Sequence, residues 1–163
     1  MQARMWHPSL FAVVASALVV GLGGAALAQT SEVGTWRLNV AKSKYSPGPA
    51  PKSATTKIEE AGAGVRITVD QVLADGSVTH WEYTANYQDR KDNRVTGNNP
   101  DADMIARTRT NATTVRSTNK KDGKITTTNI SVVSSDGKTR TVTTTGTNAR
   151  GQTVNNVAVY DRQ

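Results

Sequence analysis

The sequence predicts an all-β domain: a single antiparallel meander barrel of about eight to ten strands. Three observations support this prediction. Apolar residues alternate with polar residues at a period of two, most clearly over residues 65–70. The turn dipeptides Asp75-Gly76, Asp122-Gly123 and Asp136-Gly137 recur along the chain and indicate tight hairpins. Residues 29–163 contain no helical period long enough for a helix, so consecutive strands are expected to pair as hairpins.

Residues 1–28 are expected to be a cleaved signal peptide. Arg4 provides a positively charged start, residues 10–27 form an apolar run, and residues 26–28 have the A-x-A pattern of a cleavage site. The run is also marginally long enough for a membrane anchor, but the cleavage pattern favours export. We therefore expect residues 29–163 to form one β-barrel domain in the periplasm or outside the cell.

The composition excludes several classes of function. The chain contains no cysteine, which excludes disulfides, thiol catalysis and cysteine-ligated metal sites. Its formal net charge at pH 7 is +7, which can favour anionic surfaces. The basic residues are scattered among Asp and Thr without a block or an alternation with aromatic residues, so we expect a solvated basic face and no nucleic-acid binding.

The first strand is expected at residues 31–40, where Gly34 and Trp36 form a Gly-x-Trp motif. Gly34 allows a neighbouring chain to come close, and Trp36 can bury a large ring under one end of a barrel. We therefore predict that these two residues close the barrel structurally. Arg37 should point to the opposite face of the strand from Trp36.

Residues 41–51 are expected to form a proline-rich surface loop. They contain three of the five prolines, and proline disrupts central strands and helices. The segment is either an extended flap over the mouth of the barrel or a plain connector.

The most aromatic strand is expected at residues 77–87. Period-two alternation places Trp81, Tyr83 and Tyr87 on one face, which we expect to point inward. At most a short strand is expected at residues 94–96, within the turn-rich segment 88–103. The other strands are expected at about 53–60, 65–70, 104–109, 113–119, 125–133, 139–145 and 153–160.

The interior of this barrel is expected to be unusual, because the strands are rich in threonine, as in residues 126–128 and 143–145. Threonine suits a pleated sheet but adds little apolar area. With so few aromatic residues, a closed barrel cannot fill its interior with apolar atoms alone. It either holds a partly polar, hydrated cavity or is flattened so that little interior remains.

The sequence shows no catalytic set. His80 is the only histidine after residue 28, so a Ser-His-Asp triad could form only around it. Ser77 and Asp75 are near it in sequence, but they lie on a hairpin without the glycine pattern of a nucleophile elbow. Glu82 shares the face of His80, so surface hydrogen bonding is the simpler explanation.

No metal or cofactor site is predicted either. Asp101 and Asp103 follow Asn98 and Asn99, and together they offer oxygen ligands of the kind that calcium accepts. The segment lacks the remaining ligands and the distal Glu of a calcium loop. Asn and Asp are also ordinary turn residues.

Both ends of the predicted domain resemble the calycins, the group that contains lipocalins and fatty-acid-binding proteins. The motif formed by Gly34, Thr35 and Trp36 is similar to the Gly-x-Trp of their first strand. Residues 157–162 are similar to the closing strand of a fatty-acid-binding protein. The resemblance implies a calycin-like or lipocalin-like barrel whose cavity holds a ligand.

The same resemblance bears on how a ligand would be held. In fatty-acid-binding proteins the closing strand carries an Arg-x-Tyr pattern that binds the ligand carboxylate. Here the matching residues are Ala158, Val159 and Tyr160, so the tyrosine is present and the arginine is absent. A fatty acid is therefore not implied as the ligand. A replacement charge could come from whichever residue faces inward among Arg107, Arg109 and Arg116.

Residues 34–44, 47–51 and 151–160 also resemble a family of small uncharacterised secreted bacterial proteins, and that likeness implies no activity. We expect an exported, non-catalytic protein that binds a small amphipathic or hydrophobic ligand. Trp81, Tyr83 and Tyr87 would form an apolar wall, and Tyr160 would orient a polar group. The alternative is a cell-envelope or extracellular interaction protein with a filled barrel and a basic surface for anionic polymers.

Overall fold

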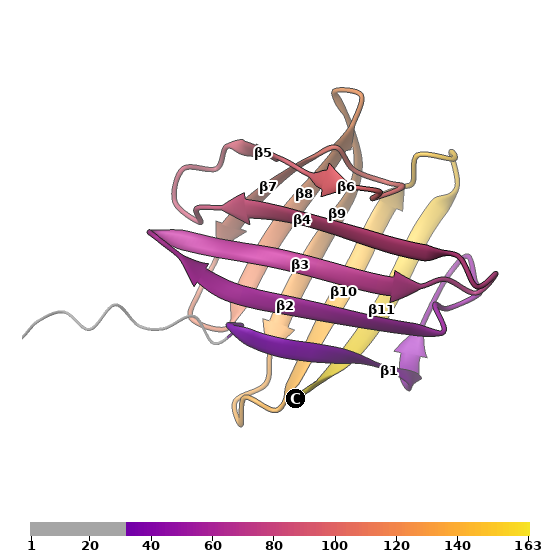
Figure 1. Ribbon diagram of the computed structural model, residues 1–163, viewed down its shortest axis with the longest axis horizontal. Helices are drawn as coiled ribbons and strands as arrows, with labels where there is room; N and C mark the ends of the chain where they lie inside the picture. The colour runs from indigo at the N-terminus through magenta and orange to yellow at the C-terminus, as the bar shows by residue number, and fades with distance from the viewer. Residues whose placement is uncertain (1–31) are drawn as a thin grey trace, which may run out of the picture.

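The computed structural model describes residues 32–163, which fold into an antiparallel β-barrel (Figure 1). The predicted signal peptide lies outside the described residues. Within residues 32–163 there is no helix, and hence none that is long and apolar enough to cross a membrane. The strands are β1 (Gly34–Lys44), β2 (Ser53–Ala61), β3 (Gly64–Val72), β4 (Val78–Ala85), β5 (Asp92–Arg94), β6 (Thr96–Gly97), β7 (Met104–Arg109), β8 (Thr114–Lys121), β9 (Lys124–Val133), β10 (Thr139–Thr147) and β11 (Thr153–Arg162).

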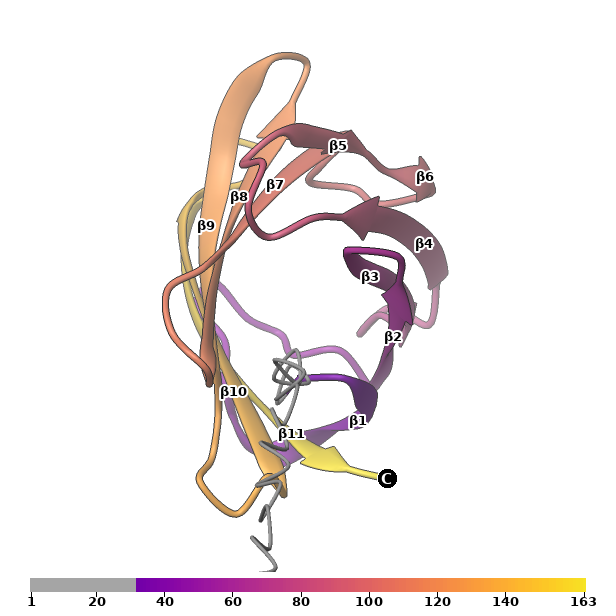
Figure 2. The same ribbon diagram turned by 90° about the vertical axis from the view of Figure 1, so that its left-hand side faces the viewer.

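The strands form one 11-stranded sheet that curls into a nearly closed barrel. Its order is β5-β7-β8-β9-β10-β11-β1-β2-β3-β4-β6, so the first long strand and the last one are neighbours. In the β1–β11 pair, Trp36 lies opposite Arg162 and Leu38 lies opposite Tyr160. Figure 2 looks into the barrel and shows β2 to β4 on one side and β8 to β10 on the other. Near the ends of the sheet, β4 lies against β5 and β7 without pairing with either.

The predicted all-β meander is confirmed, and the structure has one strand more than the expected upper count. The segment expected to hold one short strand at 94–96 holds two, β5 and β6. They are separate because they pair with different neighbours: β5 pairs with β7, and β6 pairs with β4. This segment crosses from one end of the sheet to the other and adds a few backbone hydrogen bonds to each.

The prediction that residues 41–51 form a loop is wrong for residues 41–44, which continue β1. The β1–β11 register is irregular between Asn39 and Lys44. Ser43 spans this irregularity: its Oγ donates to Asn39 O at 2.7 Å and accepts from Val159 N at 2.9 Å. All three prolines of the segment lie after the strand, so the disruption by proline begins only beyond Lys44.

The predicted tight turns are confirmed at Asp75-Gly76, Asp122-Gly123 and Asp136-Gly137. They connect β3 to β4, β8 to β9 and β9 to β10. The three glycines have φ angles of +92°, +75° and +69°, a region that favours glycine. These local signals fix where each hairpin reverses.

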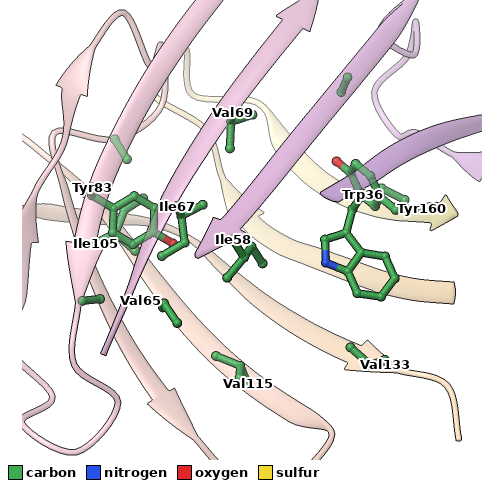
Figure 3. Packing of buried hydrophobic residues seen from close by; sticks show 14 of the residues in the cluster. Trp36, Ile58, Val65, Ile67, Val69, Tyr83, Ile105, Val115, Val133 and Tyr160 are labelled. Carbon is green, nitrogen blue, oxygen red and sulfur yellow. The ribbon is translucent and has the colours of Figure 1, made fainter. Parts of the chain in front are cut away.

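The apolar core is one cluster of buried side chains inside the barrel (Figure 3). Trp36 is 0% exposed, and Ile58 and Val65 are among the other largest fully buried side chains. Figure 3 shows these three side chains pointing toward Val115 and Val133 on the opposite wall. The predicted inward face of β4 is confirmed by the burial of Tyr83 and Ala85, and Val65, Ile67 and Val69 are buried on one face of β3.

Gly34 and Trp36 lie where the first and last strands are held together. Arg162 of β11 crosses over β1, and its Nη1 donates to Val33 O at 2.7 Å. The guanidinium carbon of Arg162 lies 4.1 Å from the centre of the Trp36 ring. Gly34 has a φ of +139°, and its missing Cβ leaves room for this guanidinium. As expected, Arg37 is exposed on the other face.

Candidate functional site

A cavity of about 520 Å³ occupies the part of the barrel that the core does not fill. The core residues Trp36, Val65 and Val115 do not line it, so the core closes one end. At the other end the lining residues come from four loops, at 45–51, 73–75, 99–101 and 148–152. Many of these loop residues are exposed, so the cavity opens to solvent between them.

The lining has two different walls. Apolar and aromatic side chains of β3, β4 and β7 form one wall: Ile67, Val69, Trp81, Tyr83 and Ile105. From β8 and β9 the lining side chains are all polar: Ser117, Asn119, Thr127, Asn129 and Ser131. Of the two interiors expected from the threonine-rich strands, the structure has the partly polar cavity. Short polar side chains leave space that longer apolar ones would have filled.

A buried ion pair lies between the cavity and the core. Arg107 Nη2 donates to both carboxylate oxygens of Glu32 at 2.7 Å, and each side chain is 3% exposed. Arg107 Nη1 donates to Tyr83 Oη at 2.9 Å, and Tyr87 Oη donates to Glu32 Oε1. Trp36 Nε1 donates to the backbone carbonyl of Glu32 at 2.7 Å. Glu32 and Arg107 therefore neutralise each other and two tyrosines extend the network, while Arg107 Nε is buried without a hydrogen-bond partner.

The surroundings keep both members of this pair charged. Burial by itself would raise the pKa of Glu32, but the charges of Arg107 and Arg140 and the hydrogen bond from Tyr87 outweigh burial and lower this pKa below its ordinary value. Burial lowers the pKa of Arg107, but its interactions with Tyr83 and Glu32 are stronger and raise it above its ordinary value. Glu32 is therefore ionised at neutral pH.

A second buried arginine, Arg140, lines the cavity and has no carboxylate partner. It lies on β10 directly opposite Tyr160 of β11 and is 7% exposed. Its Nε donates to Ser131 Oγ at 2.9 Å, and its guanidinium carbon lies 5.4 Å from the centre of the Tyr160 ring. Its Nη1 is buried without a hydrogen-bond partner. Burial lowers the pKa of Arg140 below its ordinary value, although Glu32 opposes this shift.

Three of the four predicted ligand-binding residues meet at the cavity. Trp81, Tyr83 and Tyr160 line it, and the Trp81 and Tyr83 rings stack with centroids 5.9 Å apart and planes inclined by 17°. Tyr87 is buried but is not among the lining residues, because it extends toward Glu32 at the closed end.

The structure answers which of the candidate arginines faces inward. Arg107 is buried in the barrel, Arg109 is partly buried with its guanidinium carbon 4.2 Å from the centre of the Tyr87 ring, and Arg116 is exposed. Sequence reasoning missed Glu32 and Arg140. Arg140 shares strand parity with the apolar Val142, which is the one local signal that it faces inward. Nothing local marks Glu32, whose partner is 75 residues away.

The residues around His80 do not form a triad. His80 Nδ1 lies 2.7 Å from Asp70 Oδ1 on the exposed face of the β3–β4 pair. Ser77 Oγ instead donates to Asp75 Oδ1 at 2.6 Å. The expected surface hydrogen bonding of His80 is confirmed, with Asp70 rather than Glu82 as the partner, because Asp70 lies directly across the ladder.

The carboxylates considered for calcium connect loops instead. Asp101 Oδ1 accepts from Ala149 N at 3.2 Å, and Asp103 Oδ2 accepts from Asp122 N at 2.9 Å. Over residues 32–163, no group of three His, Asp or Glu side chains is placed to hold a metal ion.

No protein-family model and no curated protein matches this sequence. The nearly closed antiparallel barrel is compatible with a calycin-like fold, and this compatibility rests on the strand arrangement alone.

Proposed function

We propose that this protein is an exported, non-catalytic binder of a small amphipathic molecule. The observation that carries the proposal is the cavity of about 520 Å³, closed by the core at one end and open between loops at the other. Pockets for small molecules typically have volumes of about 300 to 1,000 Å³ and combine apolar walls with a few polar groups.

The two walls of the cavity suit an amphipathic ligand. The stacked rings of Trp81 and Tyr83 offer a flat apolar surface beside Ile67 and Ile105. Across the cavity, the side chains of β8 and β9 offer hydroxyl and amide groups. A ligand with one apolar and one polar side would bury its apolar atoms and still form hydrogen bonds.

The proline-rich segment supports the same proposal. Tyr45, Pro47, Pro49 and Pro51 all line the cavity at its open end. Of the two roles considered for this segment, that position favours a flap over the mouth. The volume of the cavity also favours a carrier over an interaction protein with a filled barrel.

The proposal is tested with a neutral, environment-sensitive dye, N-phenylnaphthylamine, titrated into the purified barrel. We expect saturable binding, and a loss of affinity of about tenfold in Trp81→Ala, which removes most of one aromatic wall. Val78→Ala on the same strand is the matched control, because Val78 is 65% exposed, and its affinity should equal that of the wild type. Native mass spectrometry of protein from its own host should reveal a bound small molecule.

Two outcomes would contradict the proposal. One is the absence of saturable dye binding together with empty protein in native mass spectra. The other is equal affinity in the wild type and Trp81→Ala, which would place the dye outside the cavity. Thermal melts of both variants show whether each protein tested is folded.

A further inference from the structure

We propose that the cavity selects ligands that carry an anionic group, and that Arg140 binds this group. The inference rests on the proposed function and adds the chemical class of the ligand: an amphipathic molecule with a carboxylate, sulfonate or phosphate.

The first argument is the balance of buried charge. Over residues 32–163, the buried charged side chains are Glu32, Arg107 and Arg140. Glu32 and Arg107 neutralise each other through two hydrogen bonds of 2.7 Å. One positive charge therefore remains, and a buried charge without a counter-charge is costly. An anionic ligand would supply the missing charge.

The second argument is the geometry of Arg140. Its side chain is held on two sides, by the hydrogen bond from Nε to Ser131 Oγ and by the Tyr160 ring. Glu32 acts on Arg140 through its charge, but the hydrogen bonds of its carboxylate come from Arg107 and Tyr87 and not from Arg140. Arg140 Nη1 is thus a buried donor with no acceptor, on a side chain that lines the cavity. A planar guanidinium fixed in this way is suited to bind an oxyanion.

The third argument is the set of neutral donors nearby. Burial raises the pKa of Tyr160, so its hydroxyl stays protonated at neutral pH. Thr56, whose side chain lowers the pKa of Tyr160 against the effect of burial, and Ser131, which accepts from Arg140, also line the cavity. Hydroxyl groups around a cation can donate to the remaining oxygens of an anion without adding charge. Tyr160 on β11 and Arg140 on the neighbouring strand β10 would then bind the same anionic group.

The test compares two dyes that share an aromatic body and differ in one group. Anilinonaphthalene sulfonate carries an anionic sulfonate, and N-phenylnaphthylamine does not. In the wild type we expect the sulfonate dye to bind at least about tenfold more tightly, the gain typical of a hydrogen bond to a charged group. In Arg140→Gln this preference should disappear, because the affinity for the sulfonate dye should fall about tenfold more than the affinity for the neutral dye.

Two further variants control the comparison. Arg140→Lys keeps the positive charge and should retain part of the preference. Arg116→Gln removes an exposed arginine from the outer face of β8 and should leave both affinities unchanged. A competition series in the wild type needs no variant: decanoate and decyl phosphate should displace the neutral dye more strongly than decanol. The stronger of the two anions identifies the carboxylate or the phosphate as the preferred group.

The outcomes separate this inference from the proposed function. Binding of the neutral dye without any preference for the sulfonate dye, and with decanol as effective as the anions, would overturn the inference alone. Equal losses of affinity for the two dyes in Arg140→Gln would also overturn the inference, because Arg140 would then only maintain the shape of the cavity. Failure of both dyes and all competitors to bind in the wild type would overturn the proposed function as well.

Discussion

Removing one partner of the buried Glu32–Arg107 pair should destabilise the barrel strongly. In Arg107→Met, the carboxylate of Glu32 stays buried, with a side chain only 3% exposed, and keeps Tyr87 as its hydroxyl donor. Tyr83 also loses its contact with Nη1. Breaking a hydrogen-bonded buried pair in this way typically costs about 3 to 5 kcal/mol, because the carboxylate loses both hydrogen bonds from Arg107 and keeps only the charge of Arg140, which is not hydrogen-bonded to it.

Removing both charges should cost less than removing Arg107 alone. In the double variant Glu32→Gln/Arg107→Met, the amide oxygen of residue 32 can still accept from Tyr87, and no unpaired carboxylate remains. A double-mutant cycle should therefore give a coupling energy of about 2 to 3 kcal/mol. The free energies of unfolding come from urea titrations followed by tryptophan fluorescence and circular dichroism.

The exposed pair Lys57–Glu59 is the matched control. Its charged atoms are 2.8 Å apart, but its side chains are 55% and 48% exposed. Exposed pairs contribute about 0 to 1 kcal/mol, so Lys57→Met should change the unfolding free energy little. If Arg107→Met costs no more than Lys57→Met, or if the effects of Glu32→Gln and Arg107→Met simply add, the assignment of a tightly coupled buried pair is refuted.

Three other predictions concern pH, a crowded glycine and the core tryptophan. The pKa of Glu32 is lowered from 4.5 in the folded state, so the ionised carboxylate stabilises the fold above pH 4.5. This contribution is lost as the pH falls below 4.5. In acid unfolding, Glu32→Gln should therefore lose less stability than the wild type. Gly146→Ala should lower the melting temperature more than Gly151→Ala: both glycines have positive φ, but only at Gly146 would a Cβ lie 2.4 Å from a backbone oxygen. Trp36→Phe should lower the free energy of unfolding in urea by about 1 to 3 kcal/mol, since it removes the donor to the Glu32 carbonyl and leaves a void. An unchanged urea midpoint would contradict the role of Trp36 in holding Glu32.

The strand order could be predicted because hairpins are recorded locally in the chain. Alternation over residues 65–70 and the three Asp-Gly turns locate consecutive strands without knowledge of any distant residue. The predicted strand at Met104–Arg109 matches β7 in both bounds. The loop at 41–51 was predicted too long, because proline marks where a strand cannot continue but not how far before it the strand ends.

The sequence by itself determined an all-β meander and a barrel interior that apolar side chains alone could not fill. The tertiary structure alone decided which charges meet inside. Alternation orders residues within one strand, whereas the face that each strand turns inward depends on its partners and on the curl of the sheet. For this reason the chain alone did not distinguish Arg107 from Arg116. It also did not reveal that Glu32 neutralises Arg107 and leaves Arg140 unpaired, because burial of a charge is a property of the closed barrel.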